Sequence, residues 1–135
     1  MDKLKELGLR ITPQRSAIIQ CLNGNTMHPS VEDIYGILVD KYPSMSIATV
    51  YNTLEALTNR GYLRELSIDP QKKRFDPNMK PHNHLMCLAC KKIIDVHRDI
   101  KVHLPPKEQG DFEIHGHHIE FYGVCSICKK NENYP

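Results

Sequence analysis

Two cysteine pairs of identical spacing constrain this chain more than any other feature. Cys87 and Cys90 form the first pair, Cys125 and Cys128 form the second, and 34 residues separate the pairs. Four thiolates fill the tetrahedral coordination of a structural zinc ion and leave no open position. The intervening segment is too long for a compact zinc ribbon, so we expect a small sheet to be folded between the pairs. Two redox or disulfide pairs are the alternative.

The rest of the chain favours metal binding over disulfides. The N-terminus has no apolar run typical of a signal peptide, and no segment is long and apolar enough to span a membrane. We therefore expect a cytoplasmic protein with no membrane partner, in which reducing conditions leave paired cysteines available as metal ligands. Because aromatic residues are only 7% of the 135 residues, a small second half needs a stabilising element such as a metal.

A second set of candidate ligands contains no thiolate. His82 and His84 are two residues apart, so on a strand they point to the same side. Together with His28, Asp76 and Asp95 they would form a nitrogen and oxygen site that suits iron(II), manganese(II) or zinc. Spacing alone does not establish this site, because only His82 and His84 are close in sequence and single histidines are more often surface or core groups.

The first half of the chain has the pattern of a small helical domain with a hairpin. Thr12, Ser30 and Ser46 precede apolar periodic runs and predict three helix starts. Residues 62–68 and 73–76 alternate like two strands joined by a turn. This order, helices followed by a hairpin, is that of a winged helix. In a winged helix the last helix enters the major groove and the hairpin lies on the DNA backbone.

The helix after Ser46 presents a candidate DNA-reading face. We expect one apolar stripe to face the core, formed by Ile47, Val50, Leu54 and Leu57. This arrangement leaves polar or small side chains on the outer face and Tyr51 at its edge, the outer set being Thr49, Asn52, Thr53 and Ala56. An ordinary solvated helix face is the alternative to a DNA-binding one.

The chemistry of this face favours A·T-rich DNA. Asn52 can form a bidentate pair with adenine, and the methyl group of Thr49 can pack on a thymine methyl. Arg15, Lys72, Lys73 and Arg74 are candidate phosphate contacts, although most basic surface residues only increase solubility. The formal net charge of +2 permits nucleic acid as a partner but does not by itself indicate it.

The second half has the pattern of short strands. We expect strands at 84–88, 93–97, 112–115 and 119–124, and a short helix at 98–104. The helix must end at Pro105-Pro106, because proline cannot continue a helix beyond its first turn.

These motifs together resemble the ferric-uptake-regulator (Fur) family over nearly the whole chain. The resemblance rests on both cysteine pairs and on residues 10–15, 28–29, 46–52, 74–76, 82–84 and 122–125. Pattern and resemblance predict an α+β chain in three parts: an N-terminal winged-helix DNA-binding domain at 1–77, a hinge at 78–83, and a small C-terminal α/β dimerisation domain with a four-cysteine zinc site at 84–135. Pro105-Pro106 stands where the family usually has a longer helix.

The resemblance implies a homodimeric, metal-activated repressor that is not an enzyme. It assigns structural zinc to the four paired cysteines and regulatory iron(II) or manganese(II) to the five His and Asp residues. It also implies an A·T-rich palindromic operator, with Arg15, Thr49, Tyr51, Asn52 and Lys73 as DNA contacts.

Three positions resemble the peroxide-sensing branch of the family. The two carboxylate ligands, Asp76 and Asp95, are both aspartates, whereas iron-sensing relatives tend to have glutamate. Asp76 is not the cysteine that zinc-sensing relatives tend to have, and Asn52 stands where iron-sensing relatives usually have arginine. This branch implies that His28 and His82 are the residues oxidised by peroxide. The alternatives are an iron- or manganese-responsive repressor without peroxide sensing, a metalloenzyme at the His and Asp site, and a zinc-held interaction module that does not bind DNA.

Overall fold

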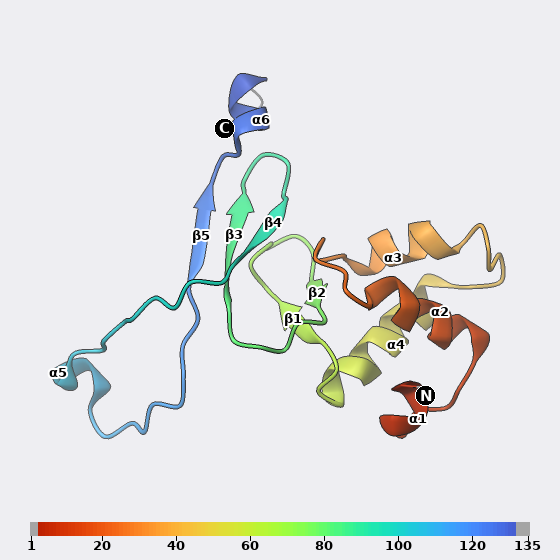
Figure 1. Cartoon of the computed structure of the whole chain (residues 1–135), viewed down its shortest axis with the longest axis horizontal. Coiled ribbons are helices and arrows are strands. Elements are labelled where there is room, and N and C mark those ends of the chain that lie inside the picture. Colours follow the sequence, from red (N-terminus) through yellow and green to blue (C-terminus); the bar gives the residue numbers. More distant parts are fainter. Residues whose placement is uncertain (1–2, 132–135) are drawn as a thin grey trace. The chain divides into compact units, whose positions relative to one another are not determined.

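Four helices and a two-stranded hairpin make up the first of two units in the chain. The computed structural model describes residues 3–131. The elements of the first unit are α1 (Lys3–Glu6), α2 (Pro13–Leu22), α3 (Val31–Leu38), α4 (Ile47–Asn59), β1 (Arg64–Leu66) and β2 (Arg74–Asp76) (Figure 1). Strands β1 and β2 pair antiparallel, with Glu65 opposite Phe75. The order of helices and hairpin is that of a winged helix, as the sequence predicted.

Side-chain caps define where the three longer helices begin. The Thr12 hydroxyl accepts a hydrogen bond from the Arg15 amide at 3.1 Å, and Pro13 occupies the first helical turn. Ser30 and Asp33 form a reciprocal capping box at the start of α3. Each cap satisfies an amide that the helix itself leaves without a partner, which is worth about 1 kcal/mol.

The core of this unit lies where α2, α3 and α4 meet. Ile18, Ile34, Leu54 and Leu57 have no exposed surface, and Phe75 from β2 packs into the same cluster. Complete burial of a side chain of this size stabilises a fold by about 1.5–3 kcal/mol. The core therefore holds α4 and the hairpin in a fixed relation within this unit.

Two of the predicted orientations on α4 are wrong. Ile47 is 48% exposed, because it is the first residue of the helix and lies beyond the apolar core. Thr53 is only 2% exposed rather than on the outer face. Its hydroxyl donates to the Thr49 carbonyl at 2.8 Å, and this backbone bond makes burial of the polar side chain possible.

The second unit contains a three-stranded sheet folded between the two cysteine pairs. Its elements are β3 (Asn83–Cys87), β4 (Ile93–Val96), α5 (Pro106–Gln109), β5 (Glu120–Gly123) and α6 (Ser126–Lys130). The strand order is β4-β3-β5, with β3 antiparallel to β4 and parallel to β5. The predicted strands at 84–88, 93–97 and 119–124 are confirmed within a residue or two at each end.

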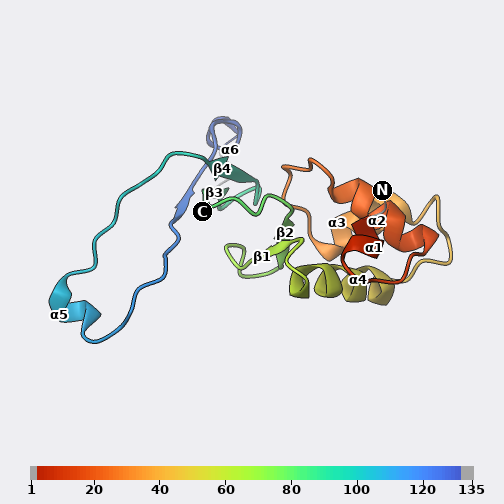
Figure 2. The same ribbon diagram turned by 60° about the horizontal axis from the view of Figure 1, so that its bottom comes forward.

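The segment between β4 and β5 differs from the prediction. Residues 97–118, which we call the arm, form no helix at 98–104 and no strand at 112–115. The only helix described in the arm is α5, which begins at Pro106, because proline suits a first helical turn. In both ribbon views α5 lies at the end of the arm away from the sheet (Figure 1 and Figure 2).

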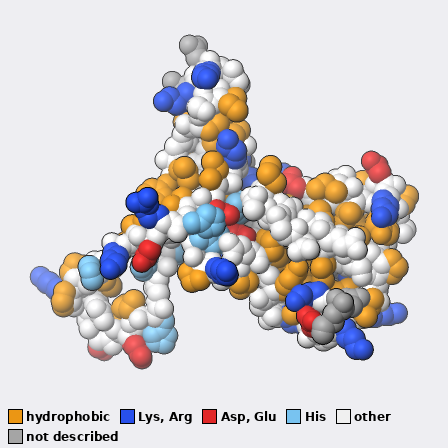
Figure 3. All heavy atoms as spheres, viewed as in Figure 1, with side chains coloured by type: hydrophobic (Ala, Val, Ile, Leu, Met, Phe, Trp, Pro, Cys, Tyr) orange, Lys and Arg blue, Asp and Glu red, His pale blue; other side chains and the backbone are white. Residues whose placement is uncertain are grey.

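The arm is exposed along nearly its whole length. Phe112 is 73% and Val102 53% exposed, and the space-filling view shows hydrophobic, charged and histidine side chains along the same segment (Figure 3). A strand at 112–115 has no neighbouring strand in the described part of this chain, and an unpaired segment of this length does not form a stable strand.

The boundary between the units falls between Lys80 and Pro81, within the 78–83 stretch that the sequence analysis assigned to a hinge. Residues 132–135 of the predicted second domain lie outside the described residues. Among residues 3–131, no helix has both the length and the apolar character that crossing a membrane requires.

Candidate metal centres and nucleic-acid interface

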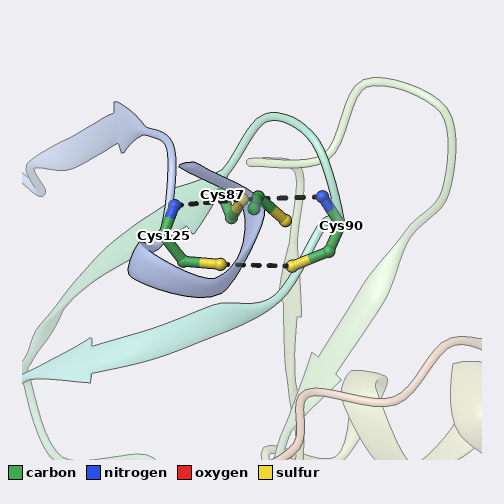
Figure 4. Close-up of side chains that lie close together, drawn as sticks. Cys87, Cys90 and Cys125 are labelled. Carbon is green, nitrogen blue, oxygen red and sulfur yellow. Dashed lines mark hydrogen bonds between the residues drawn. The ribbon is translucent and has the colours of Figure 1, made fainter. Parts of the chain in front are cut away.

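The four paired cysteines converge in the second unit. Cys87 ends β3, Cys90 follows in the turn, Cys125 precedes α6 and Cys128 lies within it. Their four sulfur atoms lie within 4.8 Å of one another, and the Sγ atoms of Cys90 and Cys125 are 3.9 Å apart (Figure 4). Sulfur atoms bound tetrahedrally at about 2.3 Å from zinc are roughly 3.8 Å apart. The cluster therefore fits a structural zinc ion.

Backbone amides prepare one of these thiols to bind a cation. The amides of Cys125 and Cys90 donate to the Cys87 sulfur at 3.4 and 3.5 Å (Figure 4). These two hydrogen bonds lower the pKa of Cys87 to about 6. The Cys128 thiol donates to the Cys125 sulfur, which raises the pKa of Cys128 to about 12. None of the five cysteines, all of which lie within residues 3–131, is part of a disulfide.

The first unit presents one imidazole and one carboxylate side by side. His28 precedes α3 and has a φ of 53°, in the left-handed region that side chains other than glycine rarely adopt. Asp76 ends β2. The Nε2 atom of His28 lies 3.5 Å from Oδ2 of Asp76, and the two side chains are 1% and 2% exposed. We call this pair the first half-site.

The second unit presents two imidazoles around one carboxylate. His84 and Asp95 are direct neighbours in the ladder of β3 and β4. The Oδ1 atom of Asp95 lies 3.1 Å from Nε2 of His82 and 3.4 Å from Nε2 of His84. The two rings meet edge to face, with centroids 4.6 Å apart. These three residues form the second half-site.

His97, for which the sequence predicted no role, is a neighbour of the second half-site. Its ring stacks on His82 with centroids 5.7 Å apart, and its Nε2 atom is 4.0 Å from Oδ2 of Asp95. The signal that could have indicated it is the spacing of two residues from Asp95, which places both side chains on one face of an extended segment.

Both half-sites offer only nitrogen and oxygen donors. Imidazole and carboxylate together suit iron(II), manganese(II) and zinc, whereas the thiolate cluster suits a tightly held zinc. Buried carboxylates are stabilised by a neighbouring cation. The chain therefore offers two chemically different types of metal ligand: a closed thiolate set, and imidazole and carboxylate groups that fit regulatory iron or manganese.

The candidate DNA contacts gather around α4 in the first unit. Arg15 and Thr49 line one open hollow of about 450 Å³, and Tyr51 and Lys73 line a second of about 200 Å³ between α4 and the hairpin. Asn52 is exposed on the same helix. The structure thus brings these residues to one helix and its immediate neighbours, although their contact with DNA stays a prediction.

A winged helix followed by a small sheet domain with a four-thiolate cluster defines a class of metal-responsive DNA-binding regulators. The chain belongs to the ferric uptake regulator family, whose model matches residues 6–122.

The relatives that the chain resembles include peroxide regulators. It is 42% identical over 137 residues to the peroxide operon regulator of Bacillus subtilis (strain 168), covering 99% of this chain and 94% of that protein. Among solved structures it is similar to PerR from Streptococcus pyogenes, described for peroxide sensing and gene regulation, at 34% identity and a TM-score of 0.52, covering 93% of this chain and 87% of the other. It is also similar to a zinc-bound manganese uptake regulator, at 27% identity and a TM-score of 0.68, covering 92% and 99%.

Proposed function

We propose that this chain is a metal-dependent transcriptional repressor that senses peroxide through oxidation of histidine at an iron or manganese site. The observation that carries the proposal is the separation of donor types, with imidazoles and carboxylates kept apart from a closed thiolate cluster. The 42% identity to a peroxide operon regulator supports the same function. Members of this family are transcriptional regulators, so we propose no enzymatic role.

The regulatory metal is proposed to join the two half-sites. Asp76 and His82 are separated by only five residues, which even fully extended span about 20 Å. This connection is short enough to allow one ion to bind both half-sites. A metal bound by His28 and Asp76 on one side, and by His82, His84 and Asp95 on the other, would fix the angle of the 78–83 hinge and thereby select the DNA-binding arrangement.

Zinc is proposed to bind at Cys87, Cys90, Cys125 and Cys128 and to hold the second unit together. The sheet is small, and its outer face leaves Leu85, Ile94 and Phe121 each more than one third exposed. A domain with so little buried surface gains much of its folding free energy from a structural metal.

The repressor is proposed to act as a homodimer on double-stranded DNA. A two-fold dimer presents two copies of α4, so it matches the two symmetric halves of a palindromic operator. Thr49, Tyr51 and Asn52 would read an A·T-rich sequence, while Arg15 and Lys73 would contact phosphates. A protein that acts on chromosomal DNA works where the chromosome is, so we propose a cytoplasmic location.

The sensing step is proposed to modify a ligand rather than a thiol. Iron(II) bound at this site supplies the chemistry that reduces peroxide. His28 and His82 are the groups that we propose to take up the oxygen, one atom from peroxide adding to one ring while the other leaves as water. An oxygenated ring is a poorer donor, so the site loses its metal and the repressor leaves the operator.

An iron- or manganese-responsive repressor without peroxide sensing is the second candidate. The similarity to a manganese uptake regulator favours this candidate. It would use the same imidazole and carboxylate ligands as the peroxide sensor. In that case the metal concentration, rather than peroxide, would control DNA binding.

Operator binding of protein reconstituted with iron(II) or manganese(II), before and after peroxide, tests the proposal. We expect both forms to bind DNA, and only the iron form to release it after peroxide. Release of both forms on metal removal, with no effect of peroxide on either, would favour the second candidate. Binding that never depends on metal would contradict both.

A further inference from the structure

Arg74 connects the hairpin turn to the loop that carries His28. Its Nη2 atom donates to Oδ2 of Asp69 at 2.9 Å, and its Nη1 atom donates to the backbone carbonyl of His28 at 3.3 Å. The Arg74 side chain is 11% exposed and the Asp69 side chain 2% exposed. One guanidinium therefore makes a buried bridge between two segments that the sequence places far apart.

The two residues that follow Arg74 contact the same loop. The amide of Phe75 donates to the Pro29 carbonyl at 2.9 Å, and the Asp76 carboxylate faces the His28 ring at 3.5 Å. Strand β2 thus contacts the loop with three consecutive residues. His28 has the left-handed backbone conformation described above, and the hydrogen bond from Arg74 to its carbonyl supports this conformation.

The other end of the bridge lies in the turn between β1 and β2. Asp69 accepts hydrogen bonds from the Gln71 amide at 3.0 Å and from Arg74. Burial opposes ionisation of Asp69, but these hydrogen bonds outweigh it and hold the pKa of the carboxyl below its ordinary value. The Asp69–Arg74 pair is therefore an ion pair at neutral pH, and it anchors the turn that leads to Lys73.

We propose that Arg74 is a positioning residue that couples the His28 and Asp76 half-site to the β1–β2 turn, so that metal binding also orders the wing, by which we mean the hairpin of residues 64–76. This inference rests on the proposed function. A metal that fixes the His28 ring also fixes its carbonyl, and the guanidinium transmits that position to Asp69. The wing, including the candidate phosphate contact Lys73, is then most ordered when the regulatory metal is bound.

A conservative pair of substitutions tests the bridge in the full-length, zinc-loaded chain. Arg74→Lys keeps the charge, but an ammonium on a flexible stem does not reproduce the planar fork that spans Asp69 and His28. Arg64→Lys is the matched control, since Arg64 lies in the same hairpin and donates to the Met79 carbonyl instead. Residues that orient metal ligands commonly change metal affinity by roughly 10–100-fold. We expect manganese(II) to bind Arg74→Lys about tenfold more weakly or worse, and Arg64→Lys within about twofold of wild type.

Hydrogen exchange of the turn at 69–73 separates coupling from a simple loss of affinity. Saturating manganese(II) should slow exchange there in wild type and in Arg64→Lys, but not in Arg74→Lys. Asp69→Asn, which leaves Arg74 in place but removes its anchor, should also lose this protection, and it carries the test if Arg74→Lys does not fold.

If Arg74→Lys binds manganese with wild-type affinity and shows wild-type protection of the turn, this inference alone is overturned. If Arg74→Lys does not fold, the same result in Asp69→Asn overturns it. Failure of the wild-type chain itself to bind manganese would overturn both this inference and the proposed function.

Discussion

The Nε2 atom of His28 lies 3.5 Å from Oδ2 of Asp76, although one residue precedes α3 and the other ends β2. The side chains are almost completely buried. Two potential ligands that lie this close together and are this deeply buried are stabilised when a cation lies beside them. Because this pair belongs to the unit that carries α4, a metal bound to it would act directly on the part of the chain that we propose to bind DNA.

Replacing His28 should therefore uncouple metal from DNA binding. We expect His28→Ala to keep its zinc and its dimeric state, but to bind operator DNA equally with and without manganese(II). The measurement is a gel-shift titration at two manganese concentrations. His115→Ala, which removes a ring that is 79% exposed in the arm, is the control and should respond like wild type. A normal manganese response in His28→Ala would show that the regulatory metal does not use this half-site.

Loss of a clustered thiolate should unfold the second unit. We expect Cys87→Ser to lose zinc and dimerisation, since its sulfur accepts two backbone hydrogen bonds in addition to offering a metal ligand. Zinc content by elemental analysis and oligomeric state by light scattering measure both effects. Cys21→Ser alters a cysteine of α2 outside the cluster and should retain zinc. A folded, dimeric and zinc-free Cys87→Ser protein would contradict this account.

We expect side chains on the outer face of α4 to determine which DNA sequence is preferred, whereas the wing contributes affinity for DNA of any sequence. If Asn52 pairs with adenine, Asn52→Ala should reduce the binding free energy by about 1–3 kcal/mol at one base position in each half of the operator. Lys73→Ala should weaken binding to all sequences alike and reduce the salt dependence. Binding to a set of single-base operator variants at two salt concentrations measures both. An unchanged sequence preference in Asn52→Ala would mean that α4 does not read DNA with this face.

Asp69 should make the first unit sensitive to acid. Its pKa is below the ordinary value of 3.8 in the folded chain, so the folded state releases this proton more readily than the unfolded state. The stabilisation is fully present above that ordinary value and is lost as the pH falls below it. We expect the difference in unfolding free energy between wild type and Asp69→Asn to be constant from about pH 7 to pH 5 and to shrink below about pH 4. Urea unfolding followed by circular dichroism measures it, and a difference that persists undiminished to about pH 2 would contradict the assignment.

Much of the fold and the four-cysteine cluster could be predicted from local signals. Thr12, Ser30 and Ser46 cap the helices as expected, because capping depends on residues within one turn. The cysteine pairs were evident from their spacing. The grouping of His84 with Asp95 depended on strand register, which the sequence pattern leaves open until the sheet is known.

The errors arose where tertiary context outweighs local pattern. Thr53 lies outside the apolar stripe from which the outer face was predicted, yet its hydroxyl bonds to the Thr49 carbonyl and its side chain is buried. The strand expected at 112–115 alternates correctly, but a strand needs a neighbour, and the described chain offers none there. Arg74 was predicted to contact phosphate, whereas its side chain is only 11% exposed and joins Asp69 to the His28 carbonyl. This contact across the fold has no local signal in the sequence.

Peptide mass spectrometry after mild peroxide treatment of the iron(II) form shows whether a histidine or a thiol is the sensor. We expect one added oxygen atom on peptides containing His28 or His82, and none on the same peptides of the manganese(II) form. The thiolates of the zinc cluster should stay unmodified, because a closed site leaves no free thiolate to react. Added oxygen found only on Cys87, Cys90, Cys125 or Cys128 would contradict the account and indicate a thiol switch.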